Sequence, residues 1–89
     1  MRFDANAANF YVNHMCAGDS VIPSCVLVID ADGLYIEAAG NSLDYVRTSA
    51  LHECRGVSAK PTTCKVVDEN GKSDFIKKKL LHYQQSSVE

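Results

Sequence analysis

The segment 42–55 constrains the fold of this chain more than any other part of the sequence. Its apolar residues recur at helical spacing and share one side of a helix: Leu43, Val46, Ala50 and Cys54. Ser42 precedes them in the position of a helix N-cap. Cys64 follows Cys54 after ten residues and opens the apolar run 64–67. The pattern therefore predicts a helix whose buried cysteine lies near the start of a strand.

The length and composition indicate one small globular domain that spans residues 1–89. Of the 89 residues, 46% are hydrophobic and 22% are charged, which argues against an intrinsically disordered chain. A chain of this length buries only about 60–65% of the surface that its unfolded form exposes, so its core is thin. Covalent cross-links would therefore contribute a large share of its stability.

The N-terminal half is predicted to form a helix followed by a β-hairpin. Asp4 can cap a helix that runs to about Ala17. The apolar stripe of this helix is narrow: Ala5, Ala8, Val12, Met15 and Cys16. The run 25–29 is apolar at every residue, which predicts a central strand with no solvent-facing side. A turn at residues 32–33 leads into a strand over 34–38, where apolar and polar residues alternate.

The C-terminal half is predicted to add a helix, a third strand and a short terminal helix. The helix ends at Gly56, and the strand over 64–67 is followed by a turn at 69–71. Ser73 starts the terminal helix, whose apolar face is formed by Phe75, Ile76, Leu80 and Tyr83. The order α-β-β-α-β-α predicts an α+β domain, with helices on one face of a small antiparallel sheet of about three strands.

Four cysteines are available for cross-links: Cys16, Cys25, Cys54 and Cys64. Pairing Cys54 with Cys64 would tie the second helix to the third strand, and pairing Cys16 with Cys25 would tie the first helix to the first strand. Closing so short a loop stabilises a domain by about 2.5–3 kcal/mol. The four residues permit three connectivities, and the sequence does not choose among them. The alternative is a set of buried free thiols that act as small hydrophobic side chains.

The spacing of these cysteines disfavours both metal binding and thiol catalysis. The pairs His14/Cys16 and His52/Cys54 carry ligands that zinc accepts. Residues two apart on a helix point in nearly opposite directions, however, so neither pair can face one ion. Cys16 and Cys54 also lie in the last turns of their helices, where the helix dipole disfavours a thiolate. We therefore expect no metal site, no cofactor, no catalytic residue and no enzymatic activity.

The charge pattern argues against nucleic acid and membrane as partners. The formal net charge is −2, and the basic run 77–79 spreads around most of a helix. No apolar run approaches the length of a membrane span. These observations favour another protein as the partner.

Aromatic side chains mark the candidate surfaces for such a partner. We expect three aromatic side chains near the N-terminus, Phe3, Phe10 and Tyr11, to be exposed, and Phe10 lies off the apolar stripe of the first helix. Tyr35 and Glu37 lie on the polar side of the hairpin and form a second candidate surface if the helices leave that side open. A free edge strand beside the hairpin could pair with another chain, so a homodimer is compatible with the sequence.

The part of the chain from about Ser24 to Gly71 resembles small cysteine-containing bacterial secreted or periplasmic domains of unknown function. In that pattern a hairpin leads through a glycine and a serine into a helix ending Ala-Leu-x-x-Cys, and a second cysteine follows on a strand. The residues that match this pattern are 39–42, Val46, 50–54 and 64–67. The resemblance implies a disulfide between Cys54 and Cys64 and an extracytoplasmic setting. It implies no activity.

The leading hypothesis is a small non-enzymatic protein-binding module stabilised by buried cysteines, which would be periplasmic or secreted if the cysteines are paired. The alternative is an intracellular inhibitor, such as a phage or mobile-element protein that acts on a host complex. This alternative is favoured by the lack of a signal-type apolar stretch after residues 1–4, and it predicts a cytoplasmic protein with free thiols. A zinc- or thiol-dependent enzyme is the third hypothesis, and its ligand geometry is poor.

Overall fold

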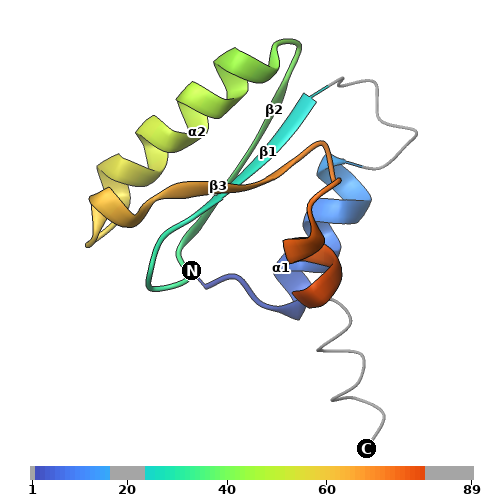
Figure 1. Ribbon diagram of the computed structural model, residues 1–89, viewed down its shortest axis with the longest axis horizontal. Helices are drawn as coiled ribbons and strands as arrows, with labels where there is room; N and C mark the ends of the chain where they lie inside the picture. Colours follow the sequence, from blue (N-terminus) through green and yellow to red (C-terminus); the bar gives the residue numbers. More distant parts are fainter. Residues whose placement is uncertain (1, 17–23, 80–89) are drawn as a thin grey trace, which may run out of the picture.

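The computed structural model describes residues 2–16 and 24–79, which form an antiparallel sheet between two layers of helix (Figure 1). The strands are β1 (Ser24–Ile29), β2 (Tyr35–Gly40) and β3 (Lys65–Glu69). The sheet is three-stranded with the order β2-β1-β3, so β1 is the central strand. All six residues of β1 are buried, as its unbroken apolar run predicts.

The α-helices α1 (Ala5–Phe10) and α2 (Leu43–Val57) follow residues whose side chains cap them. Further helical elements are the π-helical η1 (Tyr11–Met15) and the short η2 (Pro61–Thr63). Residues 74–79 are also helical. The Asp4 carboxylate accepts a hydrogen bond from the Ala7 N–H at 3.0 Å, and the Ser42 hydroxyl accepts one from the Tyr45 N–H at 3.4 Å. Both N-caps are at their predicted positions, and the α+β class and the order α-β-β-α-β-α are confirmed.

The turns that reverse the chain also lie where the sequence predicts them. Gly33 has a φ of +88° and Gly71 a φ of +73°, conformations that glycine adopts without a steric penalty. Ala17, Leu80 and Tyr83, at the predicted end of the first helix and on the face of the terminal helix, lie outside the described residues.

The helices cover both faces of the sheet and do not share one face. One core cluster joins β1 to α2: Val26, Val28, Val46, Ala50, Cys54 and Cys64. The other joins β1 to α1 and to helix 74–79: Phe3, Ala7, Ala8, Tyr11, Cys25, Leu27, Ile29 and Ile76. Alternate residues of a strand point to opposite faces. Because residues 25–29 of β1 are all apolar, each face of the sheet needs its own cover, and one-sided packing would leave half of this run in water.

Phe3 and Tyr11 are core residues, contrary to the prediction that they are exposed; the exposed fraction of Phe3 is 5%. The exposed fraction of Tyr11 is 0%, and its hydroxyl donates a hydrogen bond of 2.6 Å to the Asp68 carboxylate. Asp68 is itself only 2% exposed, and it also accepts hydrogen bonds from the Gly71 N–H at 2.9 Å and the Ser73 N–H at 2.7 Å. Burial and this carboxylate both raise the pKa of Tyr11, so the hydroxyl stays protonated as the donor.

A β-bulge in β3 makes this buried pair geometrically feasible. The register passes from Leu27 opposite Asp68 to Val28 opposite Val66, so Val67 is the extra residue. Without the bulge, Asp68 would point toward the apolar α2 side, because side chains alternate along a strand. The bulge turns Asp68 to the side where Tyr11 lies.

We predict that Tyr11→Phe lowers the free energy of unfolding by about 1–3 kcal/mol, because the buried Asp68 carboxylate loses a hydrogen-bond donor. Urea denaturation of the oxidised protein measures this loss. Tyr45→Phe is the matched control, since Tyr45 is 74% exposed on α2 and its hydroxyl should matter little. Equal stability of the two variants would contradict the role assigned to Tyr11.

Candidate functional site

All four cysteines form disulfides in the structure. Cys16 pairs with Cys25 at a Cα–Cα distance of 5.9 Å, and Cys54 pairs with Cys64 at 6.2 Å. Of the three connectivities that the sequence leaves open, the structure has the one that joins neighbouring cysteines. The first bond ties the end of η1 to β1, and the second ties α2 to the start of β3. The sulfur atoms are therefore used to hold helices to the sheet.

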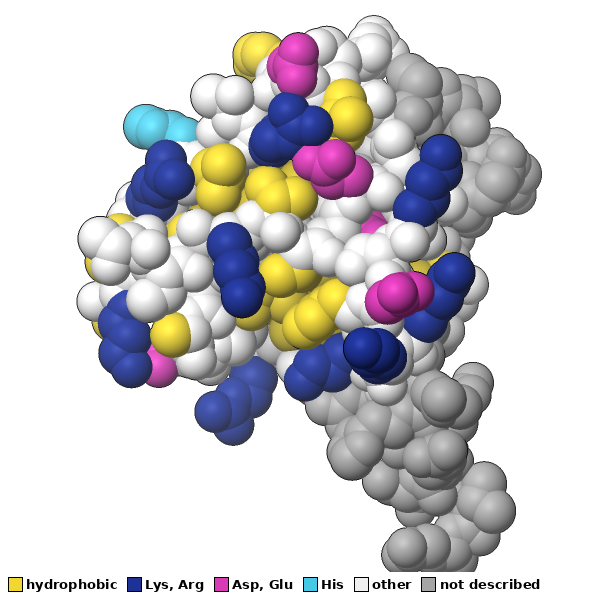
Figure 2. Space-filling model, in the orientation of Figure 1, with side chains coloured by type: hydrophobic (Ala, Val, Ile, Leu, Met, Phe, Trp, Pro, Cys, Tyr) yellow, Lys and Arg dark blue, Asp and Glu magenta, His cyan; other side chains and the backbone are white. Residues whose placement is uncertain are grey.

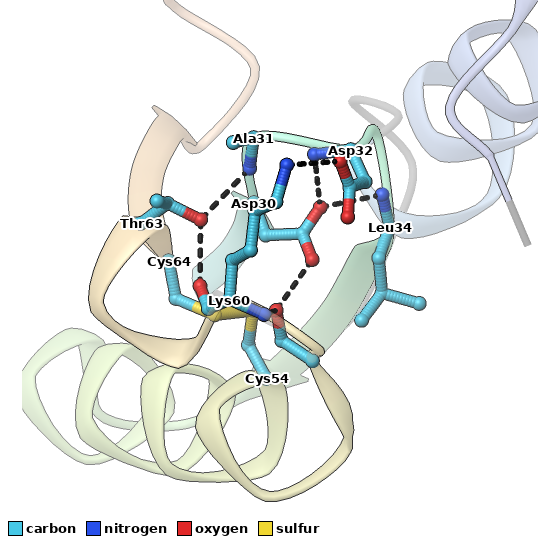
Figure 3. Close-up of a disulfide and its surroundings, with 9 residues drawn as sticks. Asp30, Ala31, Asp32, Leu34, Cys54, Lys60, Thr63 and Cys64 are labelled. Carbon is cyan, nitrogen blue, oxygen red and sulfur yellow. Dashed lines mark hydrogen bonds and ion pairs between the residues drawn. A yellow bond between two sulfur atoms is a disulfide. The ribbon is translucent and has the colours of Figure 1, made fainter.

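A polar network beside the second disulfide holds the hairpin turn onto the end of α2 (Figure 3). Its centre is Asp30, which is 7% exposed. One carboxylate oxygen of Asp30 accepts hydrogen bonds of 2.9 Å from the Asp32 and Leu34 N–H groups, and the other accepts one from the Ser58 hydroxyl. The Ser58 hydrogen bond lowers the pKa of Asp30, so the carboxylate is ionised. This residue organises a turn, as the sequence indicates for 32–33.

A second set of contacts ties the same turn to η2. The Thr63 hydroxyl accepts a hydrogen bond from the Ala31 N–H at 2.9 Å and donates one to the Lys60 carbonyl at 2.7 Å. Lys60 also forms an ion pair of 2.9 Å with Asp32. These polar groups bond to one another and to backbone atoms, so their role is structural: they form a joint between the hairpin turn, the end of α2 and η2.

A hollow of about 620 Å³ lies next to this joint, between β3, the hairpin turn and helix 74–79. We call it the β3 hollow, and its described lining combines apolar with polar and charged residues: Ile29, Asp30, Ala31, Gly33, Thr62, Thr63, Cys64, Lys65, Val67, Phe75 and Lys79. Ile29 and Cys64 are buried, whereas Val67 and Phe75 are partly buried. Figure 2 shows hydrophobic side chains gathered in the middle of the face that β3 crosses, with Lys and Arg side chains around them.

The two faces of the sheet are covered in different ways. On one face α2 is a continuous helix of 15 residues. On the other, the described cover consists of separate pieces: α1, η1 and the helix 74–79. The hollow lies beside the last of these pieces at the end of β1, where Ile29 is opposite Lys65 of β3. Among the residues of the hollow, only Cys64 was predicted from the sequence as a site residue, although Phe75 and the basic run 77–79 are visible in the sequence.

The residues that the sequence predicts to bind a partner are not all exposed in the structure. Phe10 is exposed, with an exposed fraction of 49%, and its ring lies 4.7 Å from the His14 ring. Tyr35 makes an edge contact with the buried Phe3 ring at 5.5 Å. Tyr35 and Glu37 are both only partly exposed, since α1 and Phe3 lie on their side of the sheet. The role of Tyr35 and Glu37 in partner binding stays a prediction. The hairpin surface that this role needs is smaller than expected, because part of it is covered.

The surroundings of Glu37 disfavour the charged form of its carboxyl group. Its Oε2 atom is buried without a hydrogen-bond partner among the described residues. Desolvation raises the pKa of Glu37, because burial disfavours the charged carboxylate. The folded protein therefore holds a proton on Glu37 more tightly than the unfolded chain does, and the contribution of this group to stability falls as pH rises through its folded pKa.

We predict that Glu37→Gln raises the melting temperature at pH 7 and has little effect below about pH 4, where the wild-type carboxyl is neutral in both states. Thermal unfolding at both pH values measures the difference. Glu53→Gln, on the exposed surface of α2, is the control for the loss of one negative charge. A melting temperature that falls at pH 7 would show that the Glu37 charge is stabilising.

Comparison of the chain with protein-family models, with curated proteins and with solved structures found no match. Within residues 2–16 and 24–79, no helix is long and apolar enough to span a bilayer. In that same part of the chain, no group of three or more His, Cys, Asp or Glu side chains is placed to hold a metal ion. The absence of a cofactor and of enzymatic activity stays a prediction.

We predict that proteolysis without reductant releases two linked peptide pairs, one holding Cys16 with Cys25 and the other Cys54 with Cys64, as read by mass spectrometry. Replacing Cys54 and Cys64 together by alanine should lower the free energy of unfolding by about 2.5–3 kcal/mol, because the unfolded chain regains the freedom of the open loop. Wild-type protein melted with reductant is the comparison. Crossed linkages or four alkylatable thiols would contradict the structure.

Proposed function

We propose that this protein is a disulfide-stabilised, non-enzymatic module that binds another protein through the β3 hollow. The observation that carries the proposal is an open hollow whose lining includes the apolar side chains of Ile29, Val67 and Phe75. A concave site that combines apolar side chains with a few polar groups is typical of a recognition site. Partner binding would bury Val67 and Phe75, which the fold leaves partly exposed.

The state of the reactive groups supports binding over catalysis. Both disulfides occupy the thiols, and the Asp30 carboxylate and the Ser58 hydroxyl are bonded to each other at the hairpin turn. The hydrogen bonds between Asp30, Ser58 and the hairpin turn also fix the position of the residues beside the hollow. A rigid wall next to the hollow lowers the entropy lost on binding, which favours affinity.

The two disulfides also support an extracytoplasmic setting for this function. Disulfides persist in secreted and periplasmic proteins, and they are rare in cytosolic ones, where thiols are kept reduced. An intracellular inhibitor with free thiols is therefore the less favoured alternative. Phe10, at 49% exposure, supports a second binding surface on α1 that can be tested in the same experiment.

The proposal is tested by filling the hollow from its rim. Thr62 lines the hollow and is exposed, so Thr62→Trp should block it without disturbing the core. Thr48→Trp places the same side chain on the exposed surface of α2 and is the matched control. Oxidised protein captures a partner from the source organism, and calorimetry with the purified partner gives the Kd for each variant.

We expect Thr62→Trp to weaken this binding by at least about tenfold, which corresponds to about 1.4 kcal/mol, while Thr48→Trp binds like wild type. Phe10→Ala is measured alongside. If Phe10→Ala weakens binding and Thr62→Trp does not, the partner binds α1 and the proposal for the hollow is wrong. Sedimentation at several concentrations tests self-association, and a dimer that Thr62→Trp dissolves would identify a second copy as the occupant.

A further inference from the structure

The cations around the β3 hollow are the feature that identifies the chemistry of its partner. Lys65 and Lys79 line the hollow, and the Lys79 ammonium lies 5.7 Å from the centre of the Phe75 ring. Arg2 lies at the hairpin turn, where a Cβ on Gly33 would be only 3.1 Å from Arg2 Cγ. Gly33 also lines the hollow, so Arg2 is positioned at its edge.

The acidic groups at the hairpin turn leave the lining with a net positive charge. Asp32 is paired with Lys60 at 2.9 Å. The Asp30 carboxylate, which lines the hollow, stays ionised and is held by hydrogen bonds from Ser58 and from the turn backbone. No ion pair is formed by Arg2, Lys65 or Lys79 with any acidic residue of the described part of the chain, so the two lysines of the lining outweigh the one carboxylate on a protein whose formal net charge is −2.

We infer that the β3 hollow binds an acidic segment of the partner protein, with an apolar side chain seated against Val67 and Phe75 and carboxylates beside Lys65 and Lys79. This inference rests on the proposed function, and it names the partner of the same site. The hollow supplies the apolar contact, and the cations supply charge complementarity, which selects the partner and speeds association.

A short acidic segment fits these charges better than a long polyanion does. A short segment interacts with the rim alone, whereas an extended nucleic acid or an anionic membrane would also meet the net negative charge of the rest of the chain. Non-specific nucleic-acid sites also stack successive bases on several aromatic rings. Among the described residues that line the hollow, Phe75 is the one aromatic ring.

The inference is tested with synthetic peptides on the full-length oxidised protein. One labelled peptide has a central leucine flanked by glutamates, and its counterpart has glutamines in place of the glutamates. Fluorescence anisotropy gives the Kd of each for wild type and for a double variant, Lys65→Glu with Lys79→Glu. The matched control is Lys77→Glu with Lys78→Glu, which changes the net charge equally at exposed residues that do not line the hollow.

We expect the glutamate peptide to bind wild type at least about tenfold more tightly than the glutamine peptide, and to weaken as salt is added. The hollow variant should lose that preference, and the control variant should keep it. The inference is overturned if the wild type binds neither peptide or binds both equally, or if both double variants lose binding alike. It is also overturned if single-stranded DNA or anionic vesicles displace the glutamate peptide.

These outcomes are distinct from failure of the proposed function. If Thr62→Trp abolishes binding of the captured partner while the charge variants leave it unchanged, the hollow is the binding site and its acidic selectivity is wrong. If Thr62→Trp leaves that partner bound, the proposed function itself fails, whatever the peptides do.

Discussion

Burial of β1 on both faces is the constraint on which the rest of the structure depends. Its residues 25–29 are all apolar and have no polar side that could face water, so the domain must place helices on each side of a sheet only three strands wide. The longer helix, α2, closes one face. On the other face the described cover consists of separate helical pieces, and the β3 hollow lies beside the last of them, next to Ile29.

The thinness of the core explains why the covalent and buried polar contacts matter so much. Both disulfides join a helical element to the sheet, one at η1 and the other at α2. The Tyr11–Asp68 pair plays a similar part between η1 and β3. A buried carboxylate is tolerated only when its hydrogen bonds are satisfied, and Asp68 has three such bonds from η1 and from the turn after β3.

Local sequence signals predicted the local structure well. The Asp4 and Ser42 caps, the apolar run of β1 and the glycine turns each depend on neighbouring residues, and each lies where the sequence places it. The burial of Tyr11 could not be predicted in this way. It depends on a π-helical segment that rotates the first helix away from a regular 3.6-residue pattern, and on a bulge that turns Asp68 toward it from 57 residues away. The hollow was missed for a similar reason, because its lining comes from β1, the hairpin turn, β3 and helix 74–79, which are far apart in the sequence.

The Cys54–Cys64 disulfide links the stability of this domain to its site. Cys54 is wholly buried in the cluster between α2 and β1, whereas Cys64 belongs to the lining of the hollow. Between them the chain passes through Ser58, Lys60 and Thr63, whose hydrogen bonds fix the hairpin turn beside the hollow. Closing this loop restricts the unfolded chain, and in the folded domain it holds one wall of the hollow at a fixed distance from α2. A binding surface that is already rigid loses little conformational entropy when a partner binds. The Cys54–Cys64 disulfide therefore stabilises a domain with a thin core and also keeps its proposed binding surface rigid.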